Sequence, residues 1–539
     1  MGDRRFAGDD GRVTAMQWMG WGWLVSLATA RADFALKDDG KVFTIDCGSS
    51  PALVVQVNKT NGNLQSIRVN GTELQKNARG SHINSGFGKA TVTAKPFGDD
   101  RVLVTVESMV THYYAFKKGE PAVFMATWAA DCPRPGEMRF IARLDSKVLN
   151  KGNLDRPGDD AAGKAIESKD VFLLTDGRTS SKYYSGVKFI DDAIHGSRGT
   201  NIGAYFAIGS YESSAGGPFF RDINSQTAGD TEELYFYMFS GHAQTGDFRK
   251  NQLHGPYALC LTGGPPPAMP AMGWMKDLGL KGWVAERGRV TGTATGLLPG
   301  VAYTAYLSNA TAQYWTKIPA DGKFTTHAMK PGSYTLSLMR GELSVASSSI
   351  SVGTGTLTAH LADPGLPPYL WRLGLPDGTP LGFRNAAKMG DMHPSDKRLE
   401  PWGPATFTIR EKVPANLNDF PAAQWGDVNS GNKIVFKLDP AEIKDRDLEI
   451  GITVSQYGSR PIVRLNDWKS RDPGAPPSYQ SRSITFGIWR GFDRVFTIPI
   501  PKSAFKAGTN TLTIDNLSGS GAGRFLSNAF VFDYVGMRE

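Results

Sequence analysis

The chain has 539 residues and a formal charge of +8 at pH 7 with histidine neutral. This length predicts about three domains rather than one core. Its 62 glycines and 32 prolines alternate with short bursts of Val, Thr, Ile, Tyr and Phe, as is typical of an all-β, turn-rich protein. The basic charge suits a polyanionic partner, but no cluster of Lys and Arg and no nucleic-acid-binding motif is present, so we expect no nucleic-acid partner.

Residues 1–32 have the features of an export signal with a short upstream extension. Within them, MQWMGWGWLVSLATARA has an apolar core and ends in Ala-Arg-Ala, which has the small-x-small form of a cleavage site. Downstream, no stretch stays apolar over the ~18 residues that a membrane helix needs. We therefore expect a secreted, extracellular protein with no membrane partner.

Cysteines and sequons are compatible with the same route. Three cysteines, Cys47, Cys132 and Cys260, allow one disulfide and one leftover thiol; pairing of Cys47 with Cys132 is one possibility. No Cys/His cluster has zinc spacing, so no structural zinc site is indicated. Asn-x-Ser/Thr sequons that are compatible with a glycoprotein begin at Asn58, Asn70, Asn309 and Asn516.

Residues 33–277 are expected to form a large antiparallel β-sandwich. Alternating strands such as ALVVQV and RVLVTVESMVTHYYAF are separated by NGN, NGT and GDD turns. Apolar residues do not recur at a 3.6-residue spacing over many turns, which disfavours long helices. The proline-rich stretch 263–273 predicts a semi-rigid spacer at the end of this unit.

Two smaller sandwiches are expected to follow. Residues 278–358 contain about seven short strands, which is typical of a fibronectin III-like or immunoglobulin-like domain. Residues 359–539 have alternating strands at both ends, and their length suits a jelly-roll, carbohydrate-binding-like sandwich.

Two strands of the first unit each place polar side chains on one face. In GEMRFIARLDS, Arg139 and Arg143 share a face, opposite an apolar face that packs inward; guanidinium groups arranged in this way suit carboxylates. In ELYFYMFSGHAQT, Tyr235 and Tyr237 share a face, and His242 follows a Ser-Gly break. Taken singly, exposed arginine pairs, buried aromatics and turn histidines are all common.

A lysine in a third stretch has an equally ordinary reading on its own. Lys182, in GRTSSKYYSGVKFIDD, lies in a polar turn that leads into two tyrosines. An isolated lysine in such a turn is far more often a solvated surface residue than a functional one.

Taken together, these stretches resemble the catalytic domain of the fungal, secreted rhamnogalacturonan lyases. The same resemblance includes GSHINSGFGKATVTA, SYESSAGGPFFRDINS and LHGPYAL, and it continues into MKPGSYTL, GFRNAAKMGDMHPSD and WGPATFTI. It therefore covers essentially the whole mature chain. The family's catalytic lysine and histidine fall on Lys182 and His242. Its substrate-binding residues fall on Arg139, Tyr235 and Tyr237, with Arg143 a further candidate.

The resemblance implies an endolyase that cleaves the rhamnose-(1,4)-galacturonate bond of rhamnogalacturonan I, an acidic polysaccharide of the plant cell wall. We expect a monomer, which is the default for a secreted depolymerase. β-Elimination would leave a 4,5-unsaturated galacturonate end. The reaction removes the proton on C5 and expels the oxygen on C4, so positive charge must stabilise the developing enolate. Arg139 could supply that charge, so no cofactor is expected for catalysis, while a structural calcium ion stays an open alternative.

The two catalytic candidates have complementary acid-base properties. Lysine ordinarily titrates near ~10.4, so Lys182 needs burial or neighbouring cations, such as Arg139 and Arg143, to act as the base. His242 can carry a proton near neutrality and is suited to protonating the rhamnose oxygen. An alkaline-leaning pH optimum follows, although the two residues could exchange roles.

Two alternatives stay open at this point. A glycoside hydrolase would need two carboxylates across the bond, and candidates in the first unit are Glu137, Asp191, Asp192, Glu212 and Asp222. A binding protein without turnover would use all three sandwiches for adhesion to acidic polysaccharide.

Overall fold

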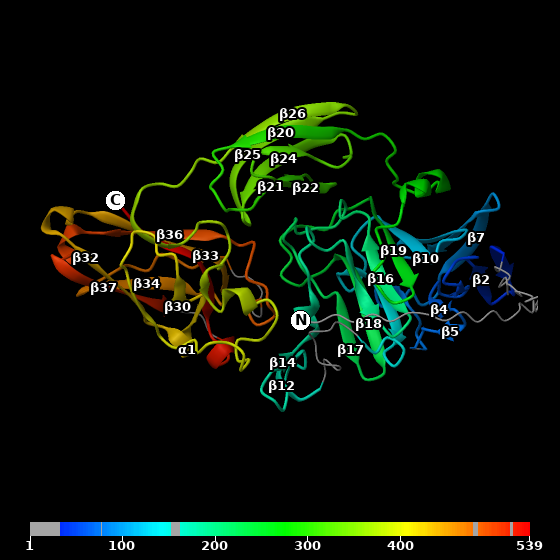
Figure 1. Cartoon of the computed structure of the whole chain (residues 1–539), viewed down its shortest axis with the longest axis horizontal. Coiled ribbons are helices and arrows are strands. Elements are labelled where there is room, and N and C mark those ends of the chain that lie inside the picture. Colours follow the sequence, from blue (N-terminus) through cyan, green and yellow to red (C-terminus); the bar gives the residue numbers. More distant parts are fainter. Residues whose placement is uncertain (1–32, 77, 152–161, 478–482, 518–520) are drawn as a thin grey trace, which may run out of the picture.

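The computed structural model describes residues 33–76, 78–151, 162–477, 483–517 and 521–539. The expected signal peptide and upstream extension, residues 1–32, lie outside the described residues. Strands dominate the structure, and the helices described are all short, which confirms the all-β fold class. Three β units follow one another along the chain: domain I (β1 to η2), domain II (β20 to β26) and domain III (β27 to β38) (Figure 1).

Domain I is built from antiparallel sheets, as expected. A five-stranded sheet has the order β1 (Ala35–Asp38), β2 (Val42–Asp46), β3 (Leu53–Asn58), β4 (Leu64–Val69) and β5 (Thr72–Glu73). A seven-stranded sheet has the order β15 (Ile194–Arg198), β16 (Gly203–Ile208), β19 (Gln252–Thr262), β10 (Ala122–Ala129), β9 (Thr111–Lys117), β8 (Arg101–Glu107) and β7 (Thr91–Phe97).

Two further sheets complete domain I. A four-stranded sheet has the order β17 (Ser225–Ala228), β18 (Thr231–Phe239), β11 (Met138–Asp145) and β6 (His82–Ile83). A small sheet joins β12 (Lys164–Glu167), β13 (Val171–Leu173) and β14 (Thr179–Ser180), and it leads directly into the one-turn 3-10 helix η1 (Lys182–Ser185).

Side-chain alternation along β11 and β18 decides which face of the four-stranded sheet is buried. Phe140 and Leu144 of β11, and Phe236 of β18, are at most 2% exposed and point into the core shared with the seven-stranded sheet. Burial of each such side chain stabilises the fold by roughly 1.5–3 kcal/mol. The alternate positions of each strand face away from this core. Arg139, Arg143, Tyr235 and Tyr237 therefore share the outer face of the sheet.

The outer face of the seven-stranded sheet is covered by the end of the expected spacer. Helix η2 (Gly273–Leu278) and the residues beside it pack Met272, Met275 and Leu280 against Phe124 of β10. The proline-rich stretch thus runs onto domain I before domain II begins.

Domain II has the seven strands expected from the sequence. One sheet has the order β23 (Lys323–Thr325), β20 (Arg289–Thr295) and β26 (Thr356–Ala362), and β20 pairs with β26 in parallel. The other has the order β22 (Gln313–Ile318), β21 (Tyr303–Ser308), β24 (Gly332–Arg340) and β25 (Leu343–Val352). Because β26 ends at Ala362, the domain II sheet continues past residue 358, where we expected the unit to end.

Domain III encloses its own apolar core between two main sheets. One contains β27 (Tyr369–Gly374), β38 (Ala529–Arg538), β33 (Arg446–Gln456) and β36 (Arg494–Ile500), with β31 (Ala423–Trp425) also paired to β38. The other contains β29 (Thr406–Thr408), β32 (Asn432–Leu438), β37 (Gly508–Leu517), β34 (Arg460–Leu465) and β35 (Trp468–Lys469). The remaining elements are β28 (Phe383–Arg384), β30 (Leu417–Pro421), α1 (Gly426–Asn429), η3 (Ala386–Lys388), η4 (Pro440–Glu442), η5 (Lys502–Ala504) and η6 (Arg524–Leu526).

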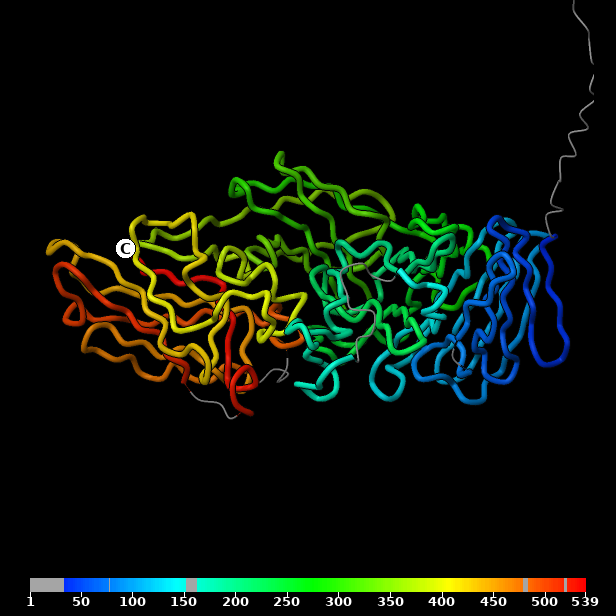
Figure 2. The backbone as a smooth tube through the Cα atoms, turned by 60° about the horizontal axis from the view of Figure 1, so that its bottom comes forward, coloured from blue at the N-terminus to red at the C-terminus, as the bar shows by residue number. Residues whose placement is uncertain are grey.

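The three domains form an extended molecule in which domain II bridges the other two. Figure 2 shows the N-terminal strands in blue at the end far from domain III, which is yellow to red. The segment around β14 and η1 lies on the side of domain I that faces domain III, and Thr179 of β14 is hydrogen-bonded to Asp396. In the described residues, no helix has both the length and the apolar character needed to span a membrane.

The three cysteines do not form the disulfide that the sequence had suggested. Cys47, Cys132 and Cys260 are all free thiols, so the described residues contain no disulfide and the suggested pairing of Cys47 with Cys132 is wrong. Cys47 lies in the domain I core and Cys260 is buried on β19, so both are packing residues.

Candidate functional site

The outer face of the four-stranded sheet brings four of the six predicted site residues together. In the β11–β18 register, Arg139 lies opposite Tyr237 and Arg143 lies opposite Glu233, with Tyr235 opposite the residue between the two arginines. A strand pair of this kind fixes each side chain relative to its neighbours on the same face. The structure therefore places these side chains on one face of the sheet, as their spacing in the sequence predicts.

The two tyrosines form a buried floor rather than an open ledge. Their rings are stacked with centroids 5.8 Å apart, and the side chains are only 6% (Tyr235) and 4% (Tyr237) exposed. The guanidinium carbon of Arg139 lies 5.9 Å from the Tyr235 centroid and 5.3 Å from the Tyr237 centroid, in cation–π range. Burial raises the pKa of both phenols well above its ordinary value, so both stay protonated.

Arg139 connects this floor to a carboxylate. Its Nη1 donates to Glu137 Oε2 at 2.8 Å and also to the hydroxyl of Tyr237. Burial opposes the charge, but Tyr237 and Glu137 outweigh it and raise the pKa of Arg139 above its ordinary value. The Nε of Arg139 is buried without a hydrogen-bond partner among the described residues. The guanidinium therefore carries a fixed positive charge, and the Arg139 side chain is still 20% exposed, so a substrate carboxylate can approach it.

Arg143, four positions along β11, is committed to other partners. Its Nε donates to Glu233 Oε1 at 2.9 Å and its Nη1 lies 3.0 Å from His82 Nε2. Burial, reinforced by the charge of Arg143, lowers the pKa of His82 to about 4, so His82 is a neutral acceptor above that pH. Glu233 also accepts a hydrogen bond from the Tyr235 hydroxyl. Arg143 thus orders Tyr235 through their shared partner Glu233.

His242 follows β18 and is oriented by a buried carboxylate. Its Nδ1 lies 2.9 Å from Asp222 Oδ1, and the other Asp222 oxygen accepts from Ser240. Asp222 is 6% exposed, whereas the His242 side chain is 27% exposed. Burial alone would lower the pKa of His242, but Asp222 outweighs it and raises that pKa above its ordinary value, with Lys182 acting against the increase. Nδ1 is thereby engaged, and Nε2 is left as the nitrogen that can exchange a proton with a substrate.

Lys182 opens the short helix η1, next to the histidine. The N-terminus of η1 is capped by Ser181, whose side chain accepts from Tyr183 N at 3.3 Å. The Lys182 side chain is 29% exposed and its Nζ lies 3.5 Å from Asp170 Oδ1. The Tyr183 ring is next to both candidates: its centroid is 5.7 Å from the lysine Nζ and 5.3 Å, edge-on, from the His242 ring.

Each of the cations that were expected to repel Lys182, and Lys182 itself, lies next to a carboxylate. Arg139 is paired with Glu137, Arg143 is paired with Glu233, and Lys182 has its own carboxylate neighbour, Asp170. The alkaline-leaning optimum, which depended on that repulsion, stays a prediction.

Sequence reasoning missed the carboxylates that organise the site. Asp222 and Glu137 had been considered only as the acid and base of a hydrolase, yet they hold His242 and Arg139. Asp222 lies in SYESSAGGPFFRDINS, one of the stretches that carried the family resemblance, which was the available signal. Of the remaining hydrolase candidates, Glu212 pairs with Arg287, Asp192 with His195 and Asp191 with Lys317.

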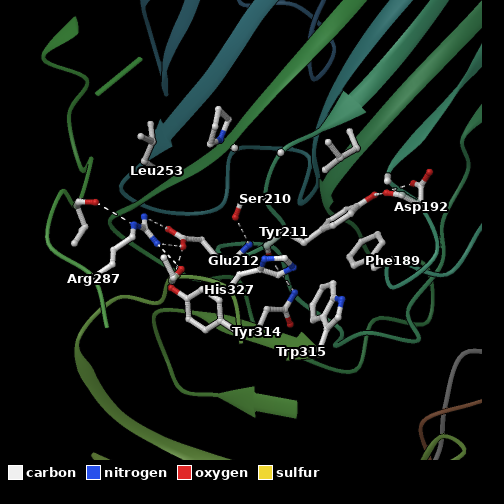
Figure 3. A pocket seen from close by; sticks show the side chains of 18 of the residues that line it. Phe189, Asp192, Ser210, Tyr211, Glu212, Leu253, Arg287, Tyr314, Trp315 and His327 are labelled. Atoms are coloured by element: carbon white, nitrogen blue, oxygen red, sulfur yellow. Dashed lines mark hydrogen bonds and ion pairs between the residues drawn. The ribbon is translucent and has the colours of Figure 1, made fainter. Parts of the chain in front are cut away.

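A cavity of about 480 Å³ lies elsewhere, between domains I and II (Figure 3). It is lined by Tyr211, Glu212, Arg287 and Trp315 among others, and by none of the six predicted site residues. Figure 3 shows Arg287 and Tyr314 both directed at Glu212. Within the described part of the chain, no group of three or more His, Cys, Asp or Glu side chains is placed to hold a metal ion.

Comparison with known proteins places the chain among enzymes of one kind. Three family profiles match in succession: "Rhamnogalacturonan lyase B, N-terminal" over residues 34–282, "Polysaccharide lyase family 4, domain II" over 286–360, and "Polysaccharide lyase family 4, domain III" over 369–537. The chain is 40% identical over 512 residues to rhamnogalacturonate lyase A of Emericella nidulans, covering 94% of this chain and 96% of that protein. The same figures hold for rhamnogalacturonate lyase A of Aspergillus aculeatus.

Proposed function

The chain belongs to the rhamnogalacturonan lyases of polysaccharide lyase family 4, and from this we propose that it is an endolyase that cleaves the rhamnose-(1,4)-galacturonate bond of rhamnogalacturonan I by β-elimination. We assign the chemistry to Lys182 and His242, and substrate binding to Arg139, Tyr235 and Tyr237, with Arg143 a further candidate whose contact with Glu233 orders Tyr235. The observation that carries the assignment is that Lys182 and His242 both lie next to the Tyr183 ring, while the His242 ring also packs against Tyr237, which the Arg139 guanidinium contacts.

Arg139 addresses the main energetic difficulty of the reaction. Loss of the C5 proton pushes electron density into a carboxylate that is already negative, so a fixed cation beside it lowers the barrier. The Arg139 side chain is 20% exposed, which supports a contact with that carboxylate. Tyr237 and Glu137 hold the guanidinium in place before the substrate arrives.

His242 is assigned the role of general acid. Asp222 raises its pKa despite burial, which keeps more of the imidazole protonated near neutrality. A protonated Nε2 can deliver its proton to the C4 oxygen as the bond to rhamnose breaks, which avoids an alkoxide leaving group. Asp222 remains bonded to Nδ1 and stabilises whichever protonation state the ring then has.

Lys182 is assigned the role of general base. A neutral amine would take the C5 proton, and the side chain is exposed enough to reach a bound polymer. Asp170 can hold the ammonium form that results. The reverse assignment, with His242 as base and Lys182 as acid, uses the same two positions, and the limb of the pH profile that shifts in Asp222→Asn distinguishes the two.

The surroundings of the reaction complete the proposal. The substrate is an acidic plant cell-wall polysaccharide, the enzyme is secreted and monomeric, and catalysis needs no cofactor. Domain III, a carbohydrate-binding-like sandwich, is proposed to act with domain I rather than as an independent module.

Incubation of the secreted protein with purified rhamnogalacturonan I tests the function. A lyase releases unsaturated ends that absorb in the ultraviolet, and the rate should be unchanged by a chelator. New reducing ends without ultraviolet absorbance would instead indicate a hydrolase, and binding without new ends would indicate an adhesion protein. A chelator-sensitive rate would overturn the cofactor-free mechanism alone.

A further inference from the structure

The segment that carries Lys182 is held from outside by domain III. Thr179, at the start of β14, donates both its backbone N–H and its hydroxyl to Asp396 Oδ2, at 2.6 and 2.8 Å. The backbone N–H of His393 donates to the Thr179 hydroxyl at 3.1 Å. Asp396 is buried and is fixed in turn by Arg398. A charged hydrogen-bond network therefore ties the strand before η1 to the stretch GFRNAAKMGDMHPSD, whose part in the family resemblance the reaction itself does not explain.

A second loop of domain III reaches η1 itself. The Phe486 ring stacks on the Tyr183 ring with a centroid separation of 4.0 Å and an interplanar angle of 10°. The Tyr183 ring also packs edge-on against His242. Next to it, the Tyr184 hydroxyl donates to the backbone carbonyl of Thr485 at 2.6 Å. Phe486, Tyr183 and His242 thus form one aromatic row that crosses from domain III into the site.

The histidine side of the site has its own contact with domain III. Arg221 donates from Nη2 to the carbonyl oxygen of Gly390 at 2.8 Å, and Arg221 immediately precedes Asp222, which orients His242. The approach at Gly390 is so close that a Cβ there would collide with the Arg221 guanidinium. Both members of the proposed catalytic pair are therefore backed by domain III.

We propose that Phe486 of domain III is a positioning residue for the elimination, acting through Tyr183 on the relative placement of Lys182 and His242. This inference rests on the proposed function. A 3-10 helix of one turn makes few hydrogen bonds of its own, so external contacts must fix its orientation. Misplacement of a reacting group by about 1 Å can cost about 100-fold in rate, so an aromatic stack that fixes this turn has a direct kinetic effect.

Steady-state kinetics of full-length variants on rhamnogalacturonan I test the proposal. Phe486→Ala removes the stack, and we expect kcat to fall about tenfold or more, which corresponds to ~1.4 kcal/mol or more in the barrier, with KM within about twofold of the wild type. Phe486→Leu keeps apolar volume without a ring face and should show the same loss. Phe486→Tyr restores the ring face and should recover most of the wild-type kcat.

A matched control removes a half-buried aromatic from the same domain at a place without contact to η1. Trp468 on β35 packs at the edge of the domain III core, and Trp468→Ala should leave kcat and KM near the wild-type values. An equal loss in Trp468→Ala, failure of Phe486→Tyr to restore kcat, or a loss confined to KM would each overturn the positioning role. If Phe486→Ala does not fold, Phe486→Leu carries the decision.

Failure of this inference differs visibly from failure of the proposed function. A wild-type protein that releases no unsaturated ends contradicts the lyase assignment itself. A wild-type lyase in which Phe486→Leu and Phe486→Ala retain kcat within about twofold contradicts only the role of domain III.

Discussion

Single residues of the site work in charged pairs, and the pair of His242 with Asp222 has the clearest chemical consequence. Asp222 is almost fully buried, so its charge acts on the imidazole with little screening by water. The imidazole remains accessible while its orientation is fixed by the Nδ1 contact. A buried carboxylate that orients the ring, together with an accessible imidazole nitrogen, is suited to acid-base catalysis.

Asp222→Asn is expected to shift one limb of the pH profile of kcat/KM. Removal of the carboxylate charge lowers the pKa of His242, because the charge is what raises it. A general acid works only below its pKa, so if His242 is the acid, the loss of activity at high pH should begin at a lower pH. If His242 is the base, the gain of activity on the acidic side should move to lower pH instead.

The matched control for this shift is a second buried pair of the same kind. Asp192 lies 2.8 Å from the Nδ1 of His195, which is not one of the six predicted site residues, and Asp192→Asn should leave both limbs in place. If neither limb moves in Asp222→Asn, His242 does not titrate in catalysis.

Arg139→Lys is expected to lower kcat by about 100-fold or more, even though the charge is kept. A lysine ammonium cannot contact Glu137, Tyr237 and a substrate carboxylate in the fixed planar geometry of a guanidinium. Initial rates from ultraviolet absorbance measure the effect. A variant with near wild-type kcat would mean that Arg139 does not stabilise the developing charge.

At the scale of strands, the outer face of the site could be predicted because alternation is a local property. Residues two apart in a strand share a face, so the positions of Arg139, Arg143, Tyr235 and Tyr237 followed from their spacing alone. The register between β11 and β18 did not, because it is set by pairing between segments about 90 residues apart, as in the contact between Arg143 and Glu233. The carboxylates Asp170 and Asp222 were present in the sequence but could not be matched to Lys182 and His242, because loops and turns separate each pair, whereas Glu137 lies two positions before Arg139 and has the spacing of a shared face.

The inner face of β11 gives a stability prediction at the same scale. Phe140 is fully buried and contacts the rings of His112, Tyr114 and Phe206. Phe140→Ala should destabilise domain I by about 3–5 kcal/mol, because it leaves a cavity in a closely packed core. Denaturant-induced unfolding measures the change. A loss below about 1 kcal/mol would mean that the site strand is not anchored by this face.

For the molecule as a whole, the number of domains and their class were predictable, whereas the contacts between domains were not. Turn spacing and composition predict each sandwich from its own segment of the chain. The contacts of Thr179 with Asp396 and of Tyr183 with Phe486 join residues about 200 to 300 apart in sequence, which such local patterns do not reveal. Domain II is joined to domain I by Glu212, which pairs with Arg287 and Lys330 and accepts from Tyr314. The functional unit is therefore larger than the catalytic sandwich.

The junction of domains I and II should weaken in acid. Burial tends to raise the pKa of Glu212, but Arg287 and Lys330 lower it below its ordinary value of 4.5. A carboxyl whose pKa is lowered by folding stabilises the folded state above its ordinary pKa, and this stabilisation is lost as pH falls. The midpoint of thermal unfolding should therefore decrease from pH 7 to pH 3, and this decrease should be smaller in Glu212→Gln. A wild-type protein and a variant with the same pH dependence would contradict the role of this carboxylate.

The central claim is that Lys182 and His242 carry out the elimination while Arg139 supplies the positive charge that stabilises the reacting carboxylate. Parallel measurements of turnover and of substrate binding test it most directly. Lys182→Ala and His242→Ala should each reduce the release of unsaturated ends from rhamnogalacturonan I by about 100-fold or more, while binding of the polymer stays near the wild-type level. Wild-type rates of ultraviolet-absorbing product in either variant would contradict the account.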